Sequence, residues 1–255
     1  MVIDPLVPLP SDHLPPVRLV EYPSRDAAEQ LALDEALLDL RETQGGPGLL
    51  RFWESGSICV VLGHTNSASR EVNLARARAR GVPILRRMSG GGAVVQGPGC
   101  LNFSLILEIA SDGRLATPGD ANAFIMRRHA ALFDSLTKEP VAYSGFSDLT
   151  IHARKFSGNA QRRRLRALLF HGCVLLDFDL AQIDDLLPMP SREPAYRDHR
   201  AHGEFVRNLG LPSSTVTEAL RQTWGAHEVT REIPHEETAR LLGERYRSPA
   251  WTFKL

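Results

Sequence analysis

The 255-residue sequence predicts an α+β protein in which pairs of short strands are separated by helices. Two observations carry this prediction. Short apolar segments bounded by Gly, Pro, Asn and Ser recur along the chain, as is typical of strands and their turns. Residues 27–42 and 121–136 instead place Ala and Leu at helical spacing. A chain of this length can bury a substantial core as one large domain or two small ones.

Composition excludes several classes of protein. Thirty Lys and Arg residues balance thirty Asp and Glu residues, so no overall field points to nucleic acid or a membrane surface. The first sixteen residues lack a cationic segment with an apolar core, and no eighteen apolar residues run together, so neither a signal peptide nor a membrane span is expected. Three cysteines without a CxxC arrangement suggest reduced thiols and a cytoplasmic protein.

The first elements follow a Pro-rich lead-in of sixteen residues. A strand is predicted at 17–22, and Ser24 or Asp26 can cap the helix at 27–42. Most of the apolar face of this helix should enter the core. Glu35 on that face is expected at its edge, either solvated or hydrogen-bonded.

A strand pair is predicted next, at 49–53 and 58–62 around an ESGS turn. The polar segment GHTN (63–66) then leaves the second strand and leads to an Ala- and Arg-rich helix at 73–80. The arginines of this helix are expected to form a solvated face rather than a binding patch; they are Arg76, Arg78 and Arg80.

The segment ILRRMSGGGAVVQGPGCLNFS (84–104) organises the chain. Strands are predicted at 84–85, 93–95 and 101–109, which places three glycines in a loop between the first two. Successive glycines after Ser89 can reach positive φ and expose several N–H donors, which suits a carboxylate, a phosphate or another oxyanion. The alternative is a glycine-rich hairpin with two solvated arginines.

Arg86 and Arg87 lie just before this loop. Successive strand residues point to opposite faces, so only one of the two arginines should enter the site. Arg87 is favoured because it is nearer the loop.

Further along, a loop at 111–120 precedes the helix at 121–136, and a turn is predicted at 143–147. Strands are predicted at 148–153 and 167–178. Between them lies RKFSGNAQRRRLR (154–166), with six basic residues in thirteen, as the loop of a hairpin. Two more helices are predicted near the end of the chain, at 214–224 and 236–246.

Three interpretations of the basic segment remain open. A nucleic-acid contact would favour interleaved aromatics, and only Phe156 is present. A plain surface turn would not need Gly158 among short hydroxyl and amide side chains. An anion site would use one cation with small hydrogen-bonding neighbours, and Lys155 supplies it; we favour this interpretation.

Taken together, RRMSGGGAVVQGPGCLNFS, ARKFSGNAQ and LLFHGCVLLDFD resemble the lipoate-protein ligase A branch of the biotin/lipoate ligase superfamily. The resemblance runs from the LALDEALL helix to at least Asp179. The combination of RR-x-SGGG-A-V with K-x-SGNAQ and HG at this spacing is far more specific than a glycine-rich loop alone.

The resemblance implies a class II synthetase-like core, a mixed, mainly antiparallel sheet flanked by helices. It also implies one catalytic domain over residues 1–255, with a core at 17–205 and a helical extension at 206–255. The implied reaction is ATP-dependent and Mg²⁺-dependent. Lipoate or octanoate attacks the α-phosphate, and a lysine of a lipoyl-carrier domain then displaces AMP. The implied carriers are 2-oxoacid dehydrogenase E2 subunits or glycine-cleavage H protein.

The resemblance also implies roles for individual residues. Lys155 would be the catalytic cation at the adenylate linkage. The lipoyl carboxyl and phosphate would be surrounded by Arg87, Ser89, Gly90, Gly91, Gly92 and Ala93. The nucleotide pocket and its floor would be formed by Ser157, Gly158, Asn159, Ala160, Asn102 and Ser104. The acyl tunnel would be closed by His171 and Gly172.

Two of the implied site residues have a plainer alternative. Asp148 could hold Mg²⁺ or a ligand hydroxyl, or it could simply cap the start of a strand. His171 could instead be a half-buried imidazole satisfied by backbone groups.

The bacterial ligases carry a separate C-terminal domain, and from residues 206–255 we do not expect one here. We therefore expect an accessory protein to supply that part, or the enzyme to work without it, or the protein to transfer acyl groups only. Octanoyltransferases share the core but use a cysteine thiolate instead of ATP. Their thiol positions correspond here to Leu168 and to the YSGF segment (143–146), which holds no cysteine.

Cys173 is then the remaining candidate for a transferase nucleophile, two residues beyond His171 on the same strand face. Its alternative is a small buried hydrophobic residue, which we favour. A third hypothesis is a non-catalytic lipoyl-binding protein, against which the retained Arg87, Lys155 and glycine run argue.

Overall fold

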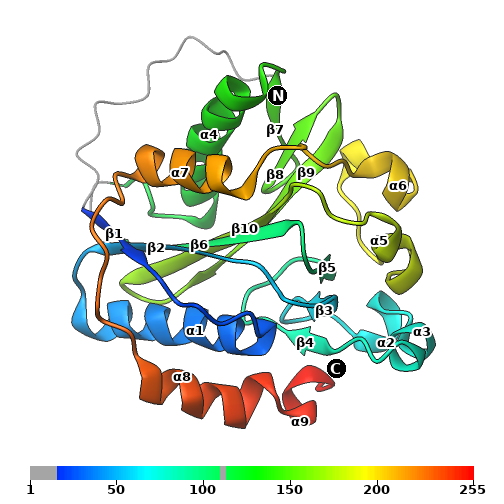
Figure 1. The fold of residues 1–255 in the computed structure, drawn as a ribbon, viewed down its shortest axis with the longest axis horizontal. Helices are drawn as coiled ribbons and strands as arrows, with labels where there is room; N and C mark the ends of the chain where they lie inside the picture. The colour runs from blue at the N-terminus through cyan, green and yellow to red at the C-terminus, as the bar shows by residue number, and fades with distance from the viewer. Residues whose placement is uncertain (1–15, 110–112) are drawn as a thin grey trace.

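The computed structural model describes residues 16–109 and 113–255, so most of the Pro-rich lead-in and the start of the loop predicted at 111–120 lie outside it. Two sheets form the centre of the described part (Figure 1). The larger has seven strands in the order β1-β2-β6-β10-β9-β8-β7, and the smaller has three in the order β4-β3-β5.

Most neighbouring strands are antiparallel. The exceptions are the parallel pairs β1 with β2 and β3 with β4. The α+β class and the mixed, mainly antiparallel sheet are therefore confirmed. The strands are β1 Val17–Val20, β2 Gly48–Trp53, β3 Cys59–Leu62, β4 Ile84–Arg86, β5 Val94–Gln96, β6 Cys100–Glu108, β7 Val141–Ser144, β8 Asp148–Ile151, β9 Arg154–Arg163 and β10 Ala167–Leu175.

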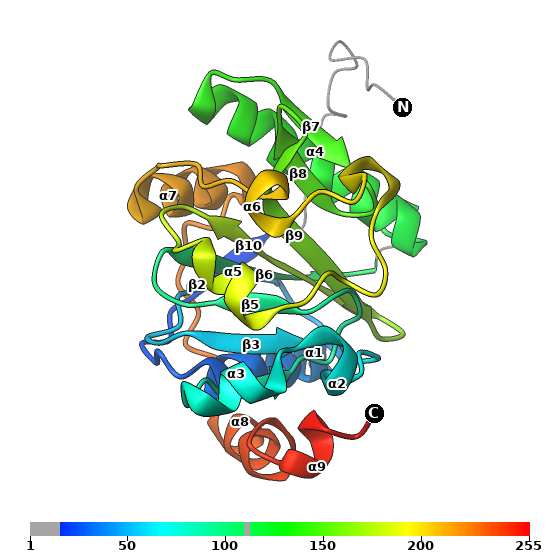
Figure 2. The ribbon, with the colours of Figure 1, turned by 90° about the vertical axis from the view of Figure 1, so that its right-hand side faces the viewer.

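Helices cover both faces of the large sheet. Figures 1 and 2 show α4 and α7 on one face, and α1 with the small sheet on the other, with α8 and α9 beyond α1. The helices are α1 Ala27–Gln44, α2 Ala68–Glu71, α3 Leu74–Ala79, α4 Pro118–Thr137, α5 Ala181–Leu186, the 3-10 turn η1 Ala195–Arg197, α6 His202–Phe205, α7 Ser213–Trp224, α8 His235–Leu241, the π turn η2 Leu242–Tyr246 and α9 Pro249–Thr252.

Strand alternation divides the core between these two faces. On β10, Leu168 and Phe170 pack into the cluster beneath α4 and α7, whereas Ala167 and Leu169 pack beneath α1. His171 and Cys173 continue the second series and therefore point to the α1 side. This face of the sheet carries the candidate site.

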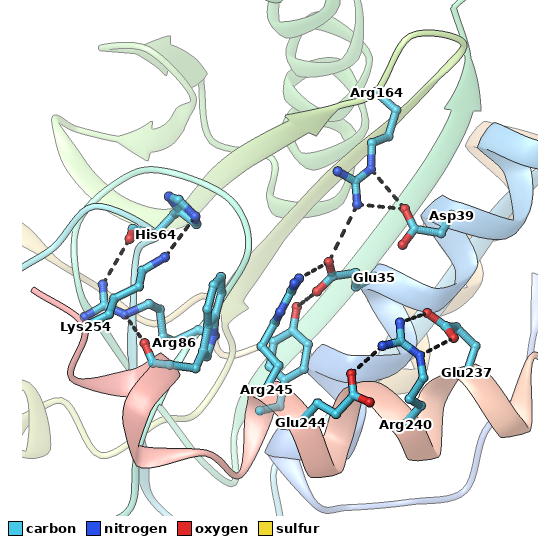
Figure 3. A network of polar contacts seen from close by, with 12 residues as sticks. Glu35, Asp39, His64, Arg86, Arg164, Glu237, Arg240, Glu244, Arg245 and Lys254 are labelled. Atoms are coloured by element: carbon cyan, nitrogen blue, oxygen red, sulfur yellow. Dashed lines mark hydrogen bonds and ion pairs between the residues drawn. The ribbon is translucent and has the colours of Figure 1, made fainter.

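Helix α1 begins as predicted and ends two residues later than predicted. Asp26 is its N-cap and accepts a hydrogen bond from the Ala28 N–H at 2.9 Å. Glu35 is buried and hydrogen-bonded, so the solvated alternative is wrong. Its carboxylate accepts hydrogen bonds from Arg245 and from the Tyr246 hydroxyl (Figure 3), because the C-terminal helices pack over α1.

The strand pair predicted around the ESGS turn is wrong. β2 pairs with β1 and β6 in the large sheet, while β3 pairs with β4 and β5 in the small one. The turn carries the chain from one sheet to the other. Two adjacent apolar strands resemble a hairpin locally, but burial against distant partners decides their pairing.

The hairpin loop predicted at 154–166 is also wrong. Ten of these residues form β9, and only 164–166 connect β9 to β10. The strand tolerates its arginines because those at each end of it reach a partner. Arg154 donates to the Val206 carbonyl at 2.7 Å, and Arg163 donates to the Leu115 carbonyl at 2.7 Å.

The turn predicted at 143–147 is shorter in the structure. Tyr143 and Ser144 belong to β7, and residues 145–147 alone make the turn. The two helices predicted near the end of the chain are confirmed, as α7 and as α8 with η2. Within residues 16–109 and 113–255, the helices are too short or too polar to cross a membrane.

Candidate functional site

The glycine loop lies between β4 and β5, where the sequence predicts it. Gly91 has φ +88°, and a Cβ built on it would lie 2.9 Å from the Arg87 guanidinium. A side chain there is opposed both by the backbone conformation and by the arginine. The loop is fixed on its other side by the His64 N–H, which donates to the Ser89 carbonyl at 2.8 Å.

The two arginines point apart, as predicted, and both are buried, so the alternative of two solvated arginines is wrong. Arg86 donates to carbonyls of the segment after β3 and of α9, including Gly63 at 2.8 Å. Arg87 donates to the carbonyls of Gly90 at 2.6 Å and Gly92 at 2.9 Å. Burial lowers the pKa of Arg87 to about 10. Arg87 therefore sets the shape of the glycine loop from inside.

Lys155 folds back over its own strand. Its Nζ lies 2.8 Å from Asp148 Oδ1, and the Tyr196 hydroxyl donates to Asp148 Oδ2 at 2.7 Å. A Cβ on Gly158 would lie 2.6 Å from both Cε and Nζ of Lys155, so only a glycine leaves room for the ammonium here. Asp148 thus holds the lysine rather than merely capping its strand.

The predicted pocket residues lie on two different faces of the large sheet. Gly158 and Ala160 pair with Cys173 and His171 and share their face. On β6, Asn102 pairs with Cys173 and Ser104 pairs with His171, so these two residues lie on that face as well. All of them lie on the side of the glycine loop.

Ser157, Asn159 and Gly172 face the other way, toward α4. The Asn159 amide donates to the Ser147 carbonyl at 2.7 Å and lies where a Gly172 side chain would be, 1.8 Å from its Cβ position. Ser157 and Asn159 therefore point away from the glycine loop, and their place in the nucleotide pocket stays a prediction. Their contribution is to join β8, β9 and β10.

His171 is held by side chains, so the alternative of an imidazole satisfied by backbone groups is wrong. Its Nε2 lies 2.5 Å from Ser89 Oγ, and its Nδ1 lies 3.1 Å from Asp34 Oδ2. Asp34 in turn forms an ion pair with Arg51. Sequence analysis missed Asp34 and Arg51. Each could have been noticed as a charged residue among apolar ones, Asp34 in the helix α1 and Arg51 in the strand β2.

Cys173 is half-buried beside Lys155 and Arg87. A hydrogen bond from Cys100 lowers its pKa to about 7, with further lowering by the charges of Lys155 and Arg87 and by the Gly158 N–H. The favoured expectation of an inert buried thiol is therefore weakened. Cys59, by contrast, is buried and has a pKa raised to about 11.

A second cationic group lies beyond the glycine loop and was not predicted. Lys254 Nζ lies 3.0 Å from His64 Nε2 and 3.7 Å from the Trp251 ring centroid (Figure 3). Burial and the neighbouring charges, among them that of Arg162, lower the pKa values of both His64 and Lys254. Lys155 is therefore not the only lysine near the candidate site, since His64, the partner of Lys254, also contacts the glycine loop through its N–H.

No dedicated metal site is evident in the part of the chain that the structure describes, where His, Cys, Asp and Glu side chains form no group of three. Both oxygens of Asp148 are already engaged by Lys155 and Tyr196. These residues do not fit a resident Mg²⁺ ion.

Comparison with known proteins indicates the family to which the chain belongs. Residues 26–223 match the model of the lipoyl protein ligase A/B catalytic domain. The chain is 34% identical over 157 residues to a protein of Aeropyrum pernix assigned as a lipoate-protein ligase A, covering 62% of this chain and 56% of the relative. An octanoyltransferase LipM of Halalkalibacterium halodurans is 24% identical, over 93% of this chain and 98% of the relative.

A solved structure supports the fold. The bi-partite lipoate protein ligase of Thermoplasma acidophilum, described with its E2 lipoyl domain, superposes with a TM-score of 0.76 at 23% identity, covering 94% of this chain and 97% of that one. The chain spans little more than half the length of some curated relatives and nearly all of others. From its sequence motifs, its fold and the match over residues 26–223, the chain belongs to the lipoyl protein ligase A/B catalytic-domain family of the biotin/lipoate ligase superfamily.

Proposed function

We propose that this protein is an ATP-dependent lipoate-protein ligase. It activates lipoate or octanoate as the acyl-adenylate and transfers the acyl group to a lysine of a lipoyl-carrier domain. The observation that supports this most is that the charges of Lys155 and Arg87 both act on Cys173, which lies on the sheet face that also meets the glycine loop. Two cations beside exposed N–H donors suit a carboxylate and a phosphate that react with each other.

In the first step a carboxylate oxygen attacks the α-phosphorus of ATP and pyrophosphate leaves. Lys155 exchanges its contact with Asp148 for the phosphoryl oxygens, where negative charge must be stabilised. The glycine loop, shaped by Arg87, holds the carboxylate in line. In the second step the carrier amine attacks the acyl carbon and AMP leaves. Catalysis in this scheme comes from positioning and electrostatics, without a covalent enzyme intermediate.

Mg²⁺ in this proposal arrives with ATP, because Asp148 is already committed to Lys155 and Tyr196. The partner is a lipoyl domain of a 2-oxoacid dehydrogenase E2 subunit or the glycine-cleavage H protein, met in the cytoplasm. Residues 1–255 act as one catalytic domain, with an accessory protein where the reaction needs one.

A second candidate is an octanoyl or lipoyl transferase with Cys173 as nucleophile. Two observations favour it over inert packing of that residue. The pKa of Cys173 is lowered to about 7, and several relatives carry the name octanoyltransferase LipM. A thiolate at neutral pH is the form that can accept an acyl group.

The decisive experiment supplies the purified protein with lipoate or octanoate, ATP and Mg²⁺ and measures pyrophosphate release. Release that depends on the acid, together with acyl-adenylate detected by mass spectrometry, supports the ligase. A parallel reaction with octanoyl-carrier protein and no ATP tests the transferase. Acyl transfer there, without pyrophosphate release in the first reaction, would refute the ligase proposal.

A further inference from the structure

Four buried side chains from four parts of the fold form one hydrogen-bonded chain. Ser89 of the glycine loop contacts His171 of β10 at 2.5 Å, and His171 contacts Asp34 of α1 at 3.1 Å. Asp34 is paired with Arg51 of β2. Ser89 also accepts a hydrogen bond from Arg87 Nε at 3.1 Å. The adenylate-forming step proposed above does not use this series of hydrogen bonds.

The direction of the hydrogen bonds follows from the charge of Asp34. Burial alone would raise the pKa of this carboxyl, but the Arg51 charge and the hydrogen bond from His171 hold it below its ordinary value. An ionised Asp34 can only accept, so His171 Nδ1 carries the proton and donates. In neutral imidazole Nε2 is then an acceptor, and the Ser89 hydroxyl donates to it.

The other charged groups around His171 complete this arrangement. Arg51 lies behind Asp34, and Arg87 acts through Ser89. On the sheet face itself the neighbours are Cys173 on β10 and Arg162 on β9. Asp34 is thus the anion that directly contacts the imidazole, and it would stabilise a proton arriving at Nε2.

We propose that Ser89, His171 and Asp34 form a proton relay for the transfer step, in which the carrier lysine attacks the acyl-adenylate. This inference rests on the proposed ligase function. As the C–N bond forms, an amine proton passes to Ser89 Oγ while the Ser89 hydroxyl proton passes to His171 Nε2. The acyl C–O bond breaks and AMP leaves with the electron pair. The imidazolium then returns its proton through Ser89 to water.

The position of Ser89 supports this role. It begins the glycine loop proposed to hold the carboxyl group, so the proposal places the reacting acyl carbon beside its hydroxyl, which is buried between His171 and Arg87. Asp34 and Arg51 act behind it as positioning residues, fixing the tautomer and orientation of His171. The first step, at the α-phosphorus, requires no proton transfer from an amine and should need the relay much less.

The test measures the two half-reactions separately. ATP–pyrophosphate exchange with lipoate reports adenylate formation, and single-turnover transfer from preformed lipoyl-adenylate to a carrier domain reports the second step. We expect His171→Gln to slow transfer by roughly a hundredfold or more, the usual contribution of a positioned base. Its effect on adenylate formation should be at least tenfold smaller. The wild-type rate of transfer should rise with pH along an acid limb that His171→Gln lacks.

The positioning role of Asp34 and Arg51 must be tested with variants that still fold. Asp34→Asn leaves Arg51 as an isolated buried cation, since Nε and one terminal nitrogen of Arg51 already lack hydrogen-bond partners among the described residues. The double variant Asp34→Leu/Arg51→Met removes both charges. We expect it to melt normally, to transfer at least tenfold more slowly at an unchanged KM for the carrier, and to lose the acid limb.

A matched control is the pair Asp39 and Arg164, which also joins α1 to β9–β10 but does not touch His171. Asp39→Leu/Arg164→Met should transfer normally. The relay is refuted if His171→Gln keeps the wild-type transfer rate and pH profile, or if both half-reactions fall equally. A wild-type protein that makes no adenylate at all would instead refute the ligase function.

Discussion

At the scale of single residues, each charged side chain of the site is fixed by a partner on another part of the fold or within its own loop. Lys155 is held by Asp148 on the neighbouring strand, and His171 by Asp34 on α1. Motif spacing pointed to Lys155, Arg87 and His171 because their residue types stand out beside glycines. Asp34 and Arg51 stand among apolar residues, and their meeting depends on how α1 packs on β2 and β10.

The role of Lys155 can be tested by its removal. Lys155→Ala deletes the ammonium that we place on the phosphoryl oxygens, and adenylate formation should slow by about a hundredfold or more. Folding should be little changed, since the ammonium is partly exposed. ATP–pyrophosphate exchange gives the rate. The control is Arg154→Ala, whose guanidinium donates to the Val206 carbonyl instead. An unchanged rate in Lys155→Ala would mean that the lysine is wrongly assigned.

Gly91 offers a test of the loop. Gly91→Val should abolish lipoate binding in a folded protein, because φ +88° strains any side chain and its Cβ would meet Arg87 at 2.9 Å. Isothermal titration of lipoate measures the loss. Gly81→Val is the matched control, with φ +64° but open space around the Cβ, and it should bind normally. Tight binding by Gly91→Val would show that the loop is only a turn.

At the scale of elements, β9 shows why local sequence was insufficient. Its basic composition is typical of a surface loop, yet Arg154 and Arg163 find acceptors in other segments and the strand continues between β8 and β10. The assignment of β9 as a strand also decides which of its residues face the site. Once β9 is a strand, alternation sends Gly158 and Ala160 toward the glycine loop and Ser157 and Asn159 away from it.

The packing of the C-terminal helices on α1 can be tested at the same scale. Tyr246 is buried against α1 and donates to Glu35 at 2.7 Å. Tyr246→Phe should lower the free energy of unfolding by roughly 1.5–3 kcal/mol, the cost of losing a hydrogen bond to a charged group. Chemical denaturation measures this. Arg240→Ala, which removes only exposed ion pairs to Glu237 and Glu244, should have a much smaller effect. Equal effects would mean that the Glu35 contact does not stabilise the fold.

At the scale of the whole molecule, the sequence predicted the class of fold and most elements but not the division into two sheets. Helical and strand periodicity are local, so α1, α4, α7 and β6 could be placed. The separation of β2 from β3 could not, because it depends on which distant strand each one meets. That separation puts the glycine loop on the small sheet and His171 on the large one, so the site lies between them.

The choice between ligase and transferase is also decided by the whole molecule, since it depends on whether Cys173 works with the groups around it. Its pKa of about 7 means that the thiolate population, and hence the rate of alkylation, should rise as the pH passes through 7. Cys59, with a pKa of about 11, should stay unreactive there. We nevertheless expect Cys173→Ala to keep most of the acyl-transfer activity, and that activity to require ATP.

A reactive thiol is not yet a nucleophile in the reaction. The carboxyl activation proposed for Lys155 and the glycine loop produces an adenylate, and an adenylate acylates an amine without a thioester. Mass spectrometry after incubation with octanoyl-carrier protein separates the two schemes. An added octanoyl group that forms without ATP and disappears in Cys173→Ala would make this an octanoyltransferase. Absence of the adduct, together with ATP-dependent transfer by Cys173→Ala, would leave the lowered pKa as a consequence of the Cys100 hydrogen bond and of the nearby charges of Lys155 and Arg87.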